Sequence, residues 1–408
     1  QRDSVWREEG IVKSLPSDPL PAKWRLPVGV GYSGPAVANG HVYLTDYVIA
    51  DGEIVNNPGR RIKLQGKERI LCVNADNGNP IWKHEYSCRY EVSFPSGPRT
   101  TPTVADGKVY TLGAMGDLRC VQADSGKLVW QKDLKKEYKT ETPVWGFTGH
   151  PLVDGNKLIC LVGGQGSVAV ALDKETGKEI WRSLSAREPG YCPPMIVEAG
   201  GTRQLIIWHA ESINGLNPET GSVYWTVPLA PDYGMSIATP RRFGNFLFAS
   251  GIGNKGALLR LDAQSPKVEI VWRGTSKTAV YCANSSPFIE NDVIYGVCRQ
   301  GELRAVDLRT GERLWETYAA TSGTRRANYA TAFIVKHADR FFLANERGEL
   351  IIAKLTPKGY EELSRASILK PTNEAMGRPV VWSHPAFANQ CIYARNDQEL
   401  VCVSLAAE

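Results

Sequence analysis

NADNGNPIW (74–82), QADSGKLVW (122–130), LDKETGKEIW (172–181), LNPETGSVYW (216–225) and VDLRTGERLW (306–315) are copies of one pattern. Each copy has a turn, a Gly, and a Trp four residues after the Gly. A degenerate copy, LDAQSPKVEIVW (261–272), lacks the Gly, and Trp24 stands in KWRL without the preceding turn. A repeat of roughly 45–50 residues with several short β-rich segments in each unit is typical of a β-propeller.

The number of units follows from the start of the first strand in each. Such starts recur at Pro35, Pro102, Pro151, Pro194, Pro240, Pro287, Ala332 and Pro385. We therefore expect an all-β fold of eight blades, each with four antiparallel strands. The last unit has only three strands, so we expect residues 22–28 to complete it and close the ring. The predicted organisation is an N-terminal extension at 1–21 and one propeller domain at 22–408.

The repeated tryptophans have a structural explanation. An indole on an outer strand can lie over the turn of the neighbouring blade, where a side chain on the Gly would clash. We predict this structural docking role for Trp24, Trp82, Trp130, Trp181, Trp225, Trp272 and Trp315.

Composition excludes several classes of protein. The net charge of +5 is mild and the basic residues are scattered, so no nucleic-acid partner is expected. No apolar run approaches the roughly 18 residues that a membrane span needs. The chain begins at Gln1, and we expect an exported, periplasmic protein whose signal has been trimmed, acting as a monomer.

Cysteine spacing gives little evidence of metal chemistry. The nine cysteines include no CxxC pair, so no metal site is expected. Cys88, Cys192 and Cys282 are placed on connections between blades, and a pair among them is a candidate disulfide. Five others are placed in strands and are expected to be small buried hydrophobes: Cys72, Cys120, Cys160, Cys298 and Cys402.

The length of the connections indicates one functional face. The turns at Asn39-Gly40, Asp106-Gly107 and Thr310-Gly311 are tight. Length variation falls on the opposite face, which carries the insertion from Tyr47 to Gly66 and the crossings between blades at 86–100, 134–150 and 366–384. Binding residues concentrate on such irregular segments. The candidate ligand-binding residues there are Tyr32, Arg99, Trp145, His150, Tyr191, Tyr281, Asn284, Arg326, Asn328, Trp382 and His384.

Two interpretations of these residues remain open. Aromatic planes, imidazoles and guanidiniums around a funnel suit a flat, anionic or sugar-like ligand. Alternatively, the aromatic residues plug the end of the channel, and the histidines bond to neighbouring backbone.

LDKETGKEIW and VDLRTGERLW resemble the tryptophan-docking motif of the pyrroloquinoline quinone (PQQ) propeller superfamily, and the likeness extends from Trp24 to Leu405. The resemblance implies one of two branches. Quinoprotein dehydrogenases hold PQQ and Ca²⁺ with an Asp base, a Glu-Asn pair, an Arg and a Trp floor. The other branch has no cofactor and includes the propeller lipoprotein of the outer-membrane β-barrel assembly machine, which binds protein partners.

This chain departs from the dehydrogenase pattern. It has no adjacent cysteines, and Glu91, Glu141, Glu188, Asp232 and Glu374 match no calcium-ligand motif. In a dehydrogenase, Trp145 or Trp382 would have to form the Trp floor under the quinone, and Arg99 would have to be the Arg clamp that holds it. Three carboxylates at the channel mouth would favour a dehydrogenase, whereas a mouth covered by the 47–66 insertion would favour a binding protein.

We therefore expect a non-catalytic, exported binding or scaffold propeller without a cofactor. Its partner would be a small molecule, a glycan or a protein on the long-loop face. The alternative is a compact PQQ-dependent oxidoreductase that uses Ca²⁺ and acts on alcohols or sugars. A third class is a carbohydrate hydrolase or lyase with His150 or His384 as the base.

Overall fold

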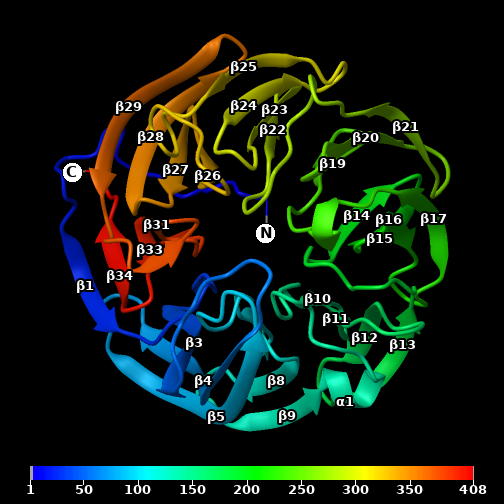
Figure 1. Ribbon diagram of the computed structural model, residues 1–408, viewed down its shortest axis with the longest axis vertical. Coiled ribbons are helices and arrows are strands. Elements are labelled where there is room, and N and C mark those ends of the chain that lie inside the picture. The colour runs from blue at the N-terminus through cyan, green and yellow to red at the C-terminus, as the bar shows by residue number, and fades with distance from the viewer. Residues whose placement is uncertain (1–2, 408) are drawn as a thin grey trace.

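The computed structural model describes residues 3–407, whose strands form a closed ring of blades (Figure 1). Within that range eight four-stranded antiparallel sheets surround a central axis, and the predicted eight-bladed propeller is confirmed. In each blade we call the strands A to D, from the innermost to the outermost. The connections from D to the next A, together with the B–C loops, share one face, which we call the crossing face.

The first four blades follow chain order. Blade 1 contains β2 (Ala36–Ala38), β3 (His41–Asp51), β4 (Ile62–Asn74) and β5 (Pro80–Val92). Blade 2 contains β6 (Thr103–Ala105), β7 (Lys108–Leu112), β8 (Asp117–Gln122) and β9 (Leu128–Asp133). Blade 3 contains β10 (Leu152–Asp154), β11 (Lys157–Leu161), β12 (Ala169–Asp173) and β13 (Glu179–Ser183). Blade 4 contains β14 (Met195–Ala199), β15 (Thr202–Trp208), β16 (Ser212–Leu216) and β17 (Val223–Pro228).

The remaining blades continue the series. Blade 5 contains β18 (Arg241–Phe243), β19 (Phe246–Gly251), β20 (Lys255–Leu261) and β21 (Val268–Arg273). Blade 6 contains β22 (Phe288–Glu290), β23 (Val293–Val297), β24 (Leu303–Asp307) and β25 (Arg313–Thr317). Blade 7 contains β26 (Ala332–His337), β27 (Arg340–Asn345), β28 (Glu349–Thr356) and β29 (Gly359–Ser367). Blade 8 contains β32 (Ala386–Ala388), β33 (Cys391–Arg395), β34 (Glu399–Ser404) and, from the other end of the chain, β1 (Ala22–Pro27).

The ring closes as the sequence predicted. β1 pairs antiparallel with β34, which places Trp24 opposite Cys402. This pairing gives blade 8 its outer strand and joins the two ends of the chain. Figure 1 shows β1 beside β34 at the rim.

Local sequence explains the tight turns on the opposite face. Asn39 and Gly40 both have positive φ (51° and 74°), as do Asp106 and Gly107 (48° and 72°). Two consecutive left-handed residues match the twist of a two-residue hairpin, and Asn, Asp and Gly adopt this conformation most readily.

Two segments expected to be irregular are extended strands instead. β3 runs to Asp51 and β4 starts at Ile62, so only 52–61 of the 47–66 insertion lies outside the strands. β5 continues to Val92, which places Cys88 within a strand rather than on a connection. The extension is stable because Tyr47, Leu64, Tyr90 and Val92 bury their side chains in one apolar cluster.

The other long crossings contain short elements of their own. The crossing after β9 begins with α1 (Leu134–Tyr138), and the crossing after β29 contains the hairpin β30 (Asn373–Ala375) and β31 (Arg378–Val380). A 3-10 turn, η1 (Asp232–Gly234), follows β17. None of the described helices has the length and apolar character that a membrane crossing requires.

The N-terminal segment packs against the propeller as a strap from the channel to the rim. Val5 bridges to Lys336 in the innermost strand β26, and Ser4 accepts a 2.7 Å hydrogen bond from Arg241 of β18. Trp6 is 5% exposed and packs against Phe342 and against Phe387, with ring centroids 5.4 and 5.2 Å away. The segment then crosses the turns of blades 7 and 8 before it enters β1.

The repeated tryptophans make the same contact at most blade boundaries. Six indole N–H groups donate to a carbonyl oxygen of the next blade, at 2.8–3.1 Å: Trp24 to Ala75, Trp82 to Ala123, Trp130 to Lys174, Trp181 to Pro218, Trp272 to Leu308 and Trp315 to Thr356. A Cβ on the turn glycine would lie 2.4–3.2 Å from the indole at Gly78, Gly126, Gly177, Gly221 and Gly311.

Trp225 differs from the other six. The turn of the next blade has Ser265-Pro266 where the turns at five of the other boundaries have Gly. The indole of Trp225 instead donates to Oε1 of Gln204 in its own blade at 2.7 Å and lies over Gly215. At this boundary the degenerate repeat lacks the Gly, and the indole donates its hydrogen bond within its own blade instead of to the next one.

Candidate functional site

Five aromatic residues gather on the crossing face and form what we call the mouth cluster: Tyr32, Phe94, Trp145, Tyr191 and Trp382. These five residues belong to two neighbouring apolar groups, and Trp145 belongs to both. Its ring lies 5.6 Å from that of Tyr191, and the Phe94 and Trp382 rings are 5.8 Å apart. Side chains from five different crossings therefore meet at one place. This is expected for residues that follow D strands.

Arg99 lies beneath the mouth cluster and bonds to backbone rather than to a carboxylate. Its guanidinium donates to the carbonyl oxygens of Gly97 (2.5 Å), Ser93 (2.9 Å) and Phe94, and lies over the Tyr32 ring at 5.2 Å. Burial lowers the pKa of Arg99 below its usual range, and burial also raises the pKa of Tyr32 to about 12. The guanidinium thus stabilises the 93–99 loop.

The two predicted histidines come together, although they belong to blades 3 and 8. The rings of His150 and His384 have centroids 5.7 Å apart and planes inclined by 31°. Nε2 of His384 shares a hydrogen bond of 2.8 Å with Oγ1 of Thr101. The pair therefore spans the axis of the ring.

The four other candidates lie on the crossings after β21 and β25. Tyr281 packs beside Gly256 and Gly274 and donates its hydroxyl to the Thr275 carbonyl at 2.5 Å. Asn284 donates to the Tyr329 carbonyl at 3.2 Å. Arg326 and Asn328 are exposed, and Arg326 donates to the Tyr318 hydroxyl at 3.3 Å.

A buried ion pair next to Trp382 was missed by the sequence analysis. Glu346 is 2% exposed and accepts from Arg378 Nε at 2.7 Å and Nη2 at 3.0 Å, and from the indole of Trp382 at 3.0 Å. Glu346 follows β27 in a B–C loop, while Arg378 begins β31. Their only signal in the sequence was their place on two segments of the predicted face.

Two hairpins bridge across part of the crossing face. Asn56, in the loop between β3 and β4, donates its side-chain amide to Oδ1 of Asn373 (2.6 Å) and to the Glu374 carbonyl (2.7 Å). Asn373 in turn donates to the Tyr32 hydroxyl at 3.1 Å. The insertion in blade 1 therefore reaches β30 beside the mouth cluster.

These residues do not fit the PQQ and calcium site that the resemblance implies. Within residues 3–407 no three His, Cys, Asp or Glu side chains are grouped as a metal site requires, and Ca²⁺ prefers several carboxylate oxygens. Arg99, the expected clamp, donates to backbone carbonyls instead.

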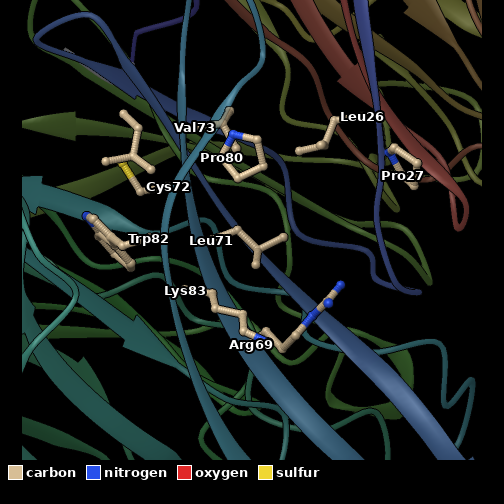
Figure 2. Close-up of a pocket in the computed structure, with 10 residues that line it drawn as sticks. Leu26, Pro27, Arg69, Leu71, Cys72, Val73, Pro80, Trp82 and Lys83 are labelled. Carbon is tan, nitrogen blue, oxygen red and sulfur yellow. The ribbon is translucent and has the colours of Figure 1, made fainter.

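A separate hollow lies at the seam where the ring closes. A cavity of about 350 Å³ is bordered by β1 of blade 8 and by β4 and β5 of blade 1. Figure 2 shows Leu26 and Pro27 on one side, Leu71 and Pro80 on the other, and Arg69 at one end. Its lining is mainly apolar and it contains no pair of groups suited to acid–base chemistry.

The ring and its repeats define the class of this protein as a PQQ-like β-propeller. The sequence model of the family described as outer membrane protein assembly factor BamB matches residues 66–234 and 209–408. The chain belongs to this family.

Individual relatives align with this chain in sequence over only part of their length. The chain is 25% identical over 201 residues to outer membrane protein assembly factor BamB of Yersinia pestis, covering 47% of each chain. It is 22% identical over 201 residues to BamB of Shewanella oneidensis, covering 48% of this chain and 49% of the relative. The chain thus spans about half the length of the curated relatives it matches.

Solved structures show the same fold. BamB from Moraxella catarrhalis aligns with a TM-score of 0.62 at 16% identity, covering 95% of this chain and 98% of the other. Quinohemoprotein alcohol dehydrogenase from Comamonas testosteroni aligns with a TM-score of 0.60 at 14% identity, covering 96% and 77%. At these identities the similarity is one of fold.

Proposed function

We propose that this protein is a non-catalytic scaffold propeller, exported to the periplasm, that binds a protein partner on its crossing face. Its partner belongs to the machinery that assembles outer-membrane proteins. The family match and the similarity to two outer membrane protein assembly factors support this proposal. The protein acts as a monomeric module within that assembly.

The observation that carries the proposal is that the polar groups at the mouth are already bonded to the protein. Arg99 is held by backbone carbonyls, Glu346 by Arg378, and the indole of Trp382 by Glu346. Such groups rigidify a surface, whereas an enzyme needs groups that are able to contact the substrate. A surface whose side chains are already held in place by hydrogen bonds is suited to binding a partner with little change of shape.

The surface offered to the partner includes exposed residues on the crossing face. Tyr233 is 65% exposed on η1, and Arg326 and Asn328 are exposed on the crossing before β26. Tyrosine and arginine are enriched in protein interfaces because each combines apolar area with a polar group. The exposed side chains of these three residues are suited to contact with another protein.

Site-specific photo-cross-linking tests this assignment. A photoreactive amino acid is placed at Tyr233 or Arg326, with Asn291 and Thr220 on the opposite turn face as matched exposed controls. The proteins are expressed in a bacterium with an outer membrane, and mass spectrometry identifies the adducts. We expect adducts with outer-membrane assembly components from the crossing face only. Equal adducts from both faces, or none from the crossing face, would contradict the proposal.

The PQQ-dependent alternative has its own test. The purified protein is titrated with PQQ and Ca²⁺ while tryptophan fluorescence is recorded, and dye reduction is then measured with alcohols and sugars. We expect no saturable quenching at high micromolar PQQ and no dye reduction. Saturable, calcium-dependent quenching together with dye reduction would replace the scaffold proposal by a compact quinoprotein dehydrogenase.

We also propose that the indole contacts between blades are the tryptophan-docking interactions of this superfamily. The supporting observations are the hydrogen bonds to the next blade and the close approach of five indoles to turn glycines. Their role is to hold the ring together, so that the crossings keep a fixed arrangement.

A further inference from the structure

Two buried cysteines of blade 6 face one another although they come from different segments. Cys282 lies on the crossing between β21 and β22, and Cys298 directly follows β23. The two residues form an isolated antiparallel bridge with each other. Both thiols are reduced and almost fully buried, at 1% and 4% exposed.

The hydrogen bonds of the two residues identify the type of bridge. The amide of Cys282 donates to Oγ of Ser250 at 2.9 Å, and the amide of Cys298 donates to the Glu302 carbonyl at 2.8 Å. Neither amide donates to the opposite cysteine, so this is a non-hydrogen-bonded pair. Such pairs bring their Cα atoms to about 4.5 Å, with side chains on the same face. A disulfide needs a Cα separation of about 4.4–6.8 Å.

We propose that Cys282 and Cys298 form a disulfide bond under oxidising conditions, a modification site beyond the scaffold function. The bond fixes the crossing that leads into blade 6 to the end of β23. Asn284, whose amide reaches the next crossing at Tyr329, lies within the closed loop. The disulfide therefore holds part of the crossing face.

The surroundings of Cys298 identify it as the first nucleophile. Its sulfur accepts hydrogen bonds from Nη1 of Arg304 at 3.0 Å and from the amide of Tyr281 at 3.2 Å. A charged donor stabilises the thiolate, which is the reactive form. Burial opposes this and raises the pKa of Cys298 to about 11, so exchange in the folded protein is faster at higher pH.

The chemistry is thiol–disulfide exchange with an external disulfide of a small molecule or protein. The Cys298 thiolate attacks one sulfur of that disulfide and releases its partner as a thiol, which takes up one proton. The Cys282 thiolate then attacks Cys298 and releases the second thiol with the other proton. Two protein thiols are oxidised and one external disulfide is reduced to two thiols.

A second close pair in the chain provides a matched control. Cys391 and Cys402 lie on the paired strands β33 and β34, but Cys391 faces Ser404 and Cys402 faces Tyr393. Their side chains are diagonal neighbours on one face of the sheet, and the two thiols hydrogen-bond to each other. Diagonal neighbours nevertheless place their Cβ atoms farther apart than the roughly 3.8 Å of a disulfide. We expect this pair to remain reduced under the same conditions.

Peptide mapping of the purified full chain tests the bond. The protein is equilibrated with mixtures of oxidised and reduced glutathione, unfolded in acid and alkylated. Trypsin leaves both cysteines in the peptide 278–299, and cleavage after Glu290 separates them. We expect 278–290 and 291–299 to remain linked until a reductant is added, while Cys391 and Cys402 are alkylated. Alkylation of Cys282 and Cys298 after full oxidation, or linkage of either to another cysteine, would overturn the proposal.

Thermal melting provides a second readout. Oxidised wild-type protein should melt a few degrees above the reduced form, because the bond restricts the unfolded chain. The variants Cys282→Ser and Cys298→Ser should show no redox-dependent difference, and Cys402→Ser should keep it. A redox-dependent shift that survives in Cys282→Ser would contradict this assignment.

Discussion

At the scale of single residues, one contact recurs around the ring. An indole N–H donates to a carbonyl of the next blade, and in five boundaries the indole lies against a glycine with positive φ that has no Cβ. The sequence predicted this contact because the Trp and the Gly stand at fixed positions in each repeat. Where the glycine is missing, at blade 5, the contact differs.

Replacing Trp181 should test the strength of this contact. Trp181 is 8% exposed and donates to the Pro218 carbonyl at 3.1 Å. Trp181→Ala should lower the free energy of unfolding by about 3–5 kcal/mol, because it removes a buried indole and leaves a cavity. Denaturant unfolding measures this loss.

Trp315 provides the control for this measurement. It also donates to the next blade, but it is only partly buried and the turn in blade 7 lacks the repeated motif. Trp315→Ala should therefore cost less than Trp181→Ala. Equal losses would show that the glycine contact adds nothing to the stability of the boundary.

A buried carboxyl between blades 1 and 2 should make stability depend on pH. Burial raises the pKa of Glu68 above 4.5, although the hydroxyls of Tyr86 and Tyr90 donate to it and lower its pKa. The folded state therefore holds this proton more tightly than the unfolded state. Its contribution to stability is present below pH 4.5 and is lost as the pH rises through the folded pKa.

The measurement compares wild type with Glu68→Gln. The free energy of unfolding of wild type, relative to the variant, should fall as the pH rises above 4.5. Glu85 is the control of opposite sign, because Lys67 and Lys83 lower its pKa to about 2. For Glu85→Gln the wild-type advantage should be lost as the pH falls from 4.5 towards 2. A wild-type advantage over Glu68→Gln that grows with pH would contradict the assignment.

At the scale of elements, the 47–66 insertion forms paired strands at both of its ends, where the sequence predicted an irregular loop. β3, β4 and β5 extend because alternate residues such as Tyr47, Leu64 and Tyr90 bury in one cluster. The alternation was visible in the sequence, but a long insertion in one blade has no counterpart in the others. Only the tertiary structure shows that these longer strands pack against Ala114 and Met115 of blade 2.

Shortening this hairpin should loosen a distant one. Replacing residues 52–61 with Asn-Gly removes Asn56 and its hydrogen bonds to Asn373 and Glu374. Amides of 373–380 should then exchange with solvent about tenfold faster or more, while the melting temperature changes little. Val55→Ser, at an exposed position of the same loop, should leave this exchange unchanged. Unchanged exchange in the shortened protein would show that β30–β31 is held by its own crossing.

At the scale of the whole molecule, the two ends of the chain complete the ring. The N-terminal strap lies against blades 7 and 8, and β1 supplies the outer strand of blade 8. The sequence predicted the role of β1 because the last unit lacked a strand. It predicted residues 1–21 only as an extension, since their contacts to Lys336 and Phe342 follow no repeat.

Two truncations should separate the strap from the closing strand. Removing residues 1–21 exposes the sites of Trp6, Ile11 and Leu20 and should lower the melting temperature while the protein stays monomeric. Removing 1–27 also takes away β1 and Trp24, leaving β34 as an unpaired edge, and should cause association. Light scattering after size-exclusion chromatography measures both. Monomeric behaviour of the longer truncation would show that the ring does not need β1.

The candidate site was predicted only in part. The sequence placed Tyr32, Arg99, Trp145 and Trp382 on the crossing face because they follow D strands, and the structure has them there. The sequence did not show that Arg99 bonds to backbone carbonyls or that Glu346 holds Trp382. The contact between Glu346 and Trp382 joins residues 36 positions apart in the chain. The hydrogen bonds of Arg99 depend on how its own loop folds back, and no repeating pattern encodes either contact.

By itself, the sequence determined the eight blades, their tight turns and the strand that closes the ring. Those features are local or periodic: a Gly and a Trp recur at a fixed spacing, and Asn, Asp and Gly favour the left-handed turns. Only the tertiary structure decided how the crossings meet at the mouth, where the strap lies and which cysteines face each other. Those contacts depend on packing between segments far apart in the chain, which no repeating pattern encodes.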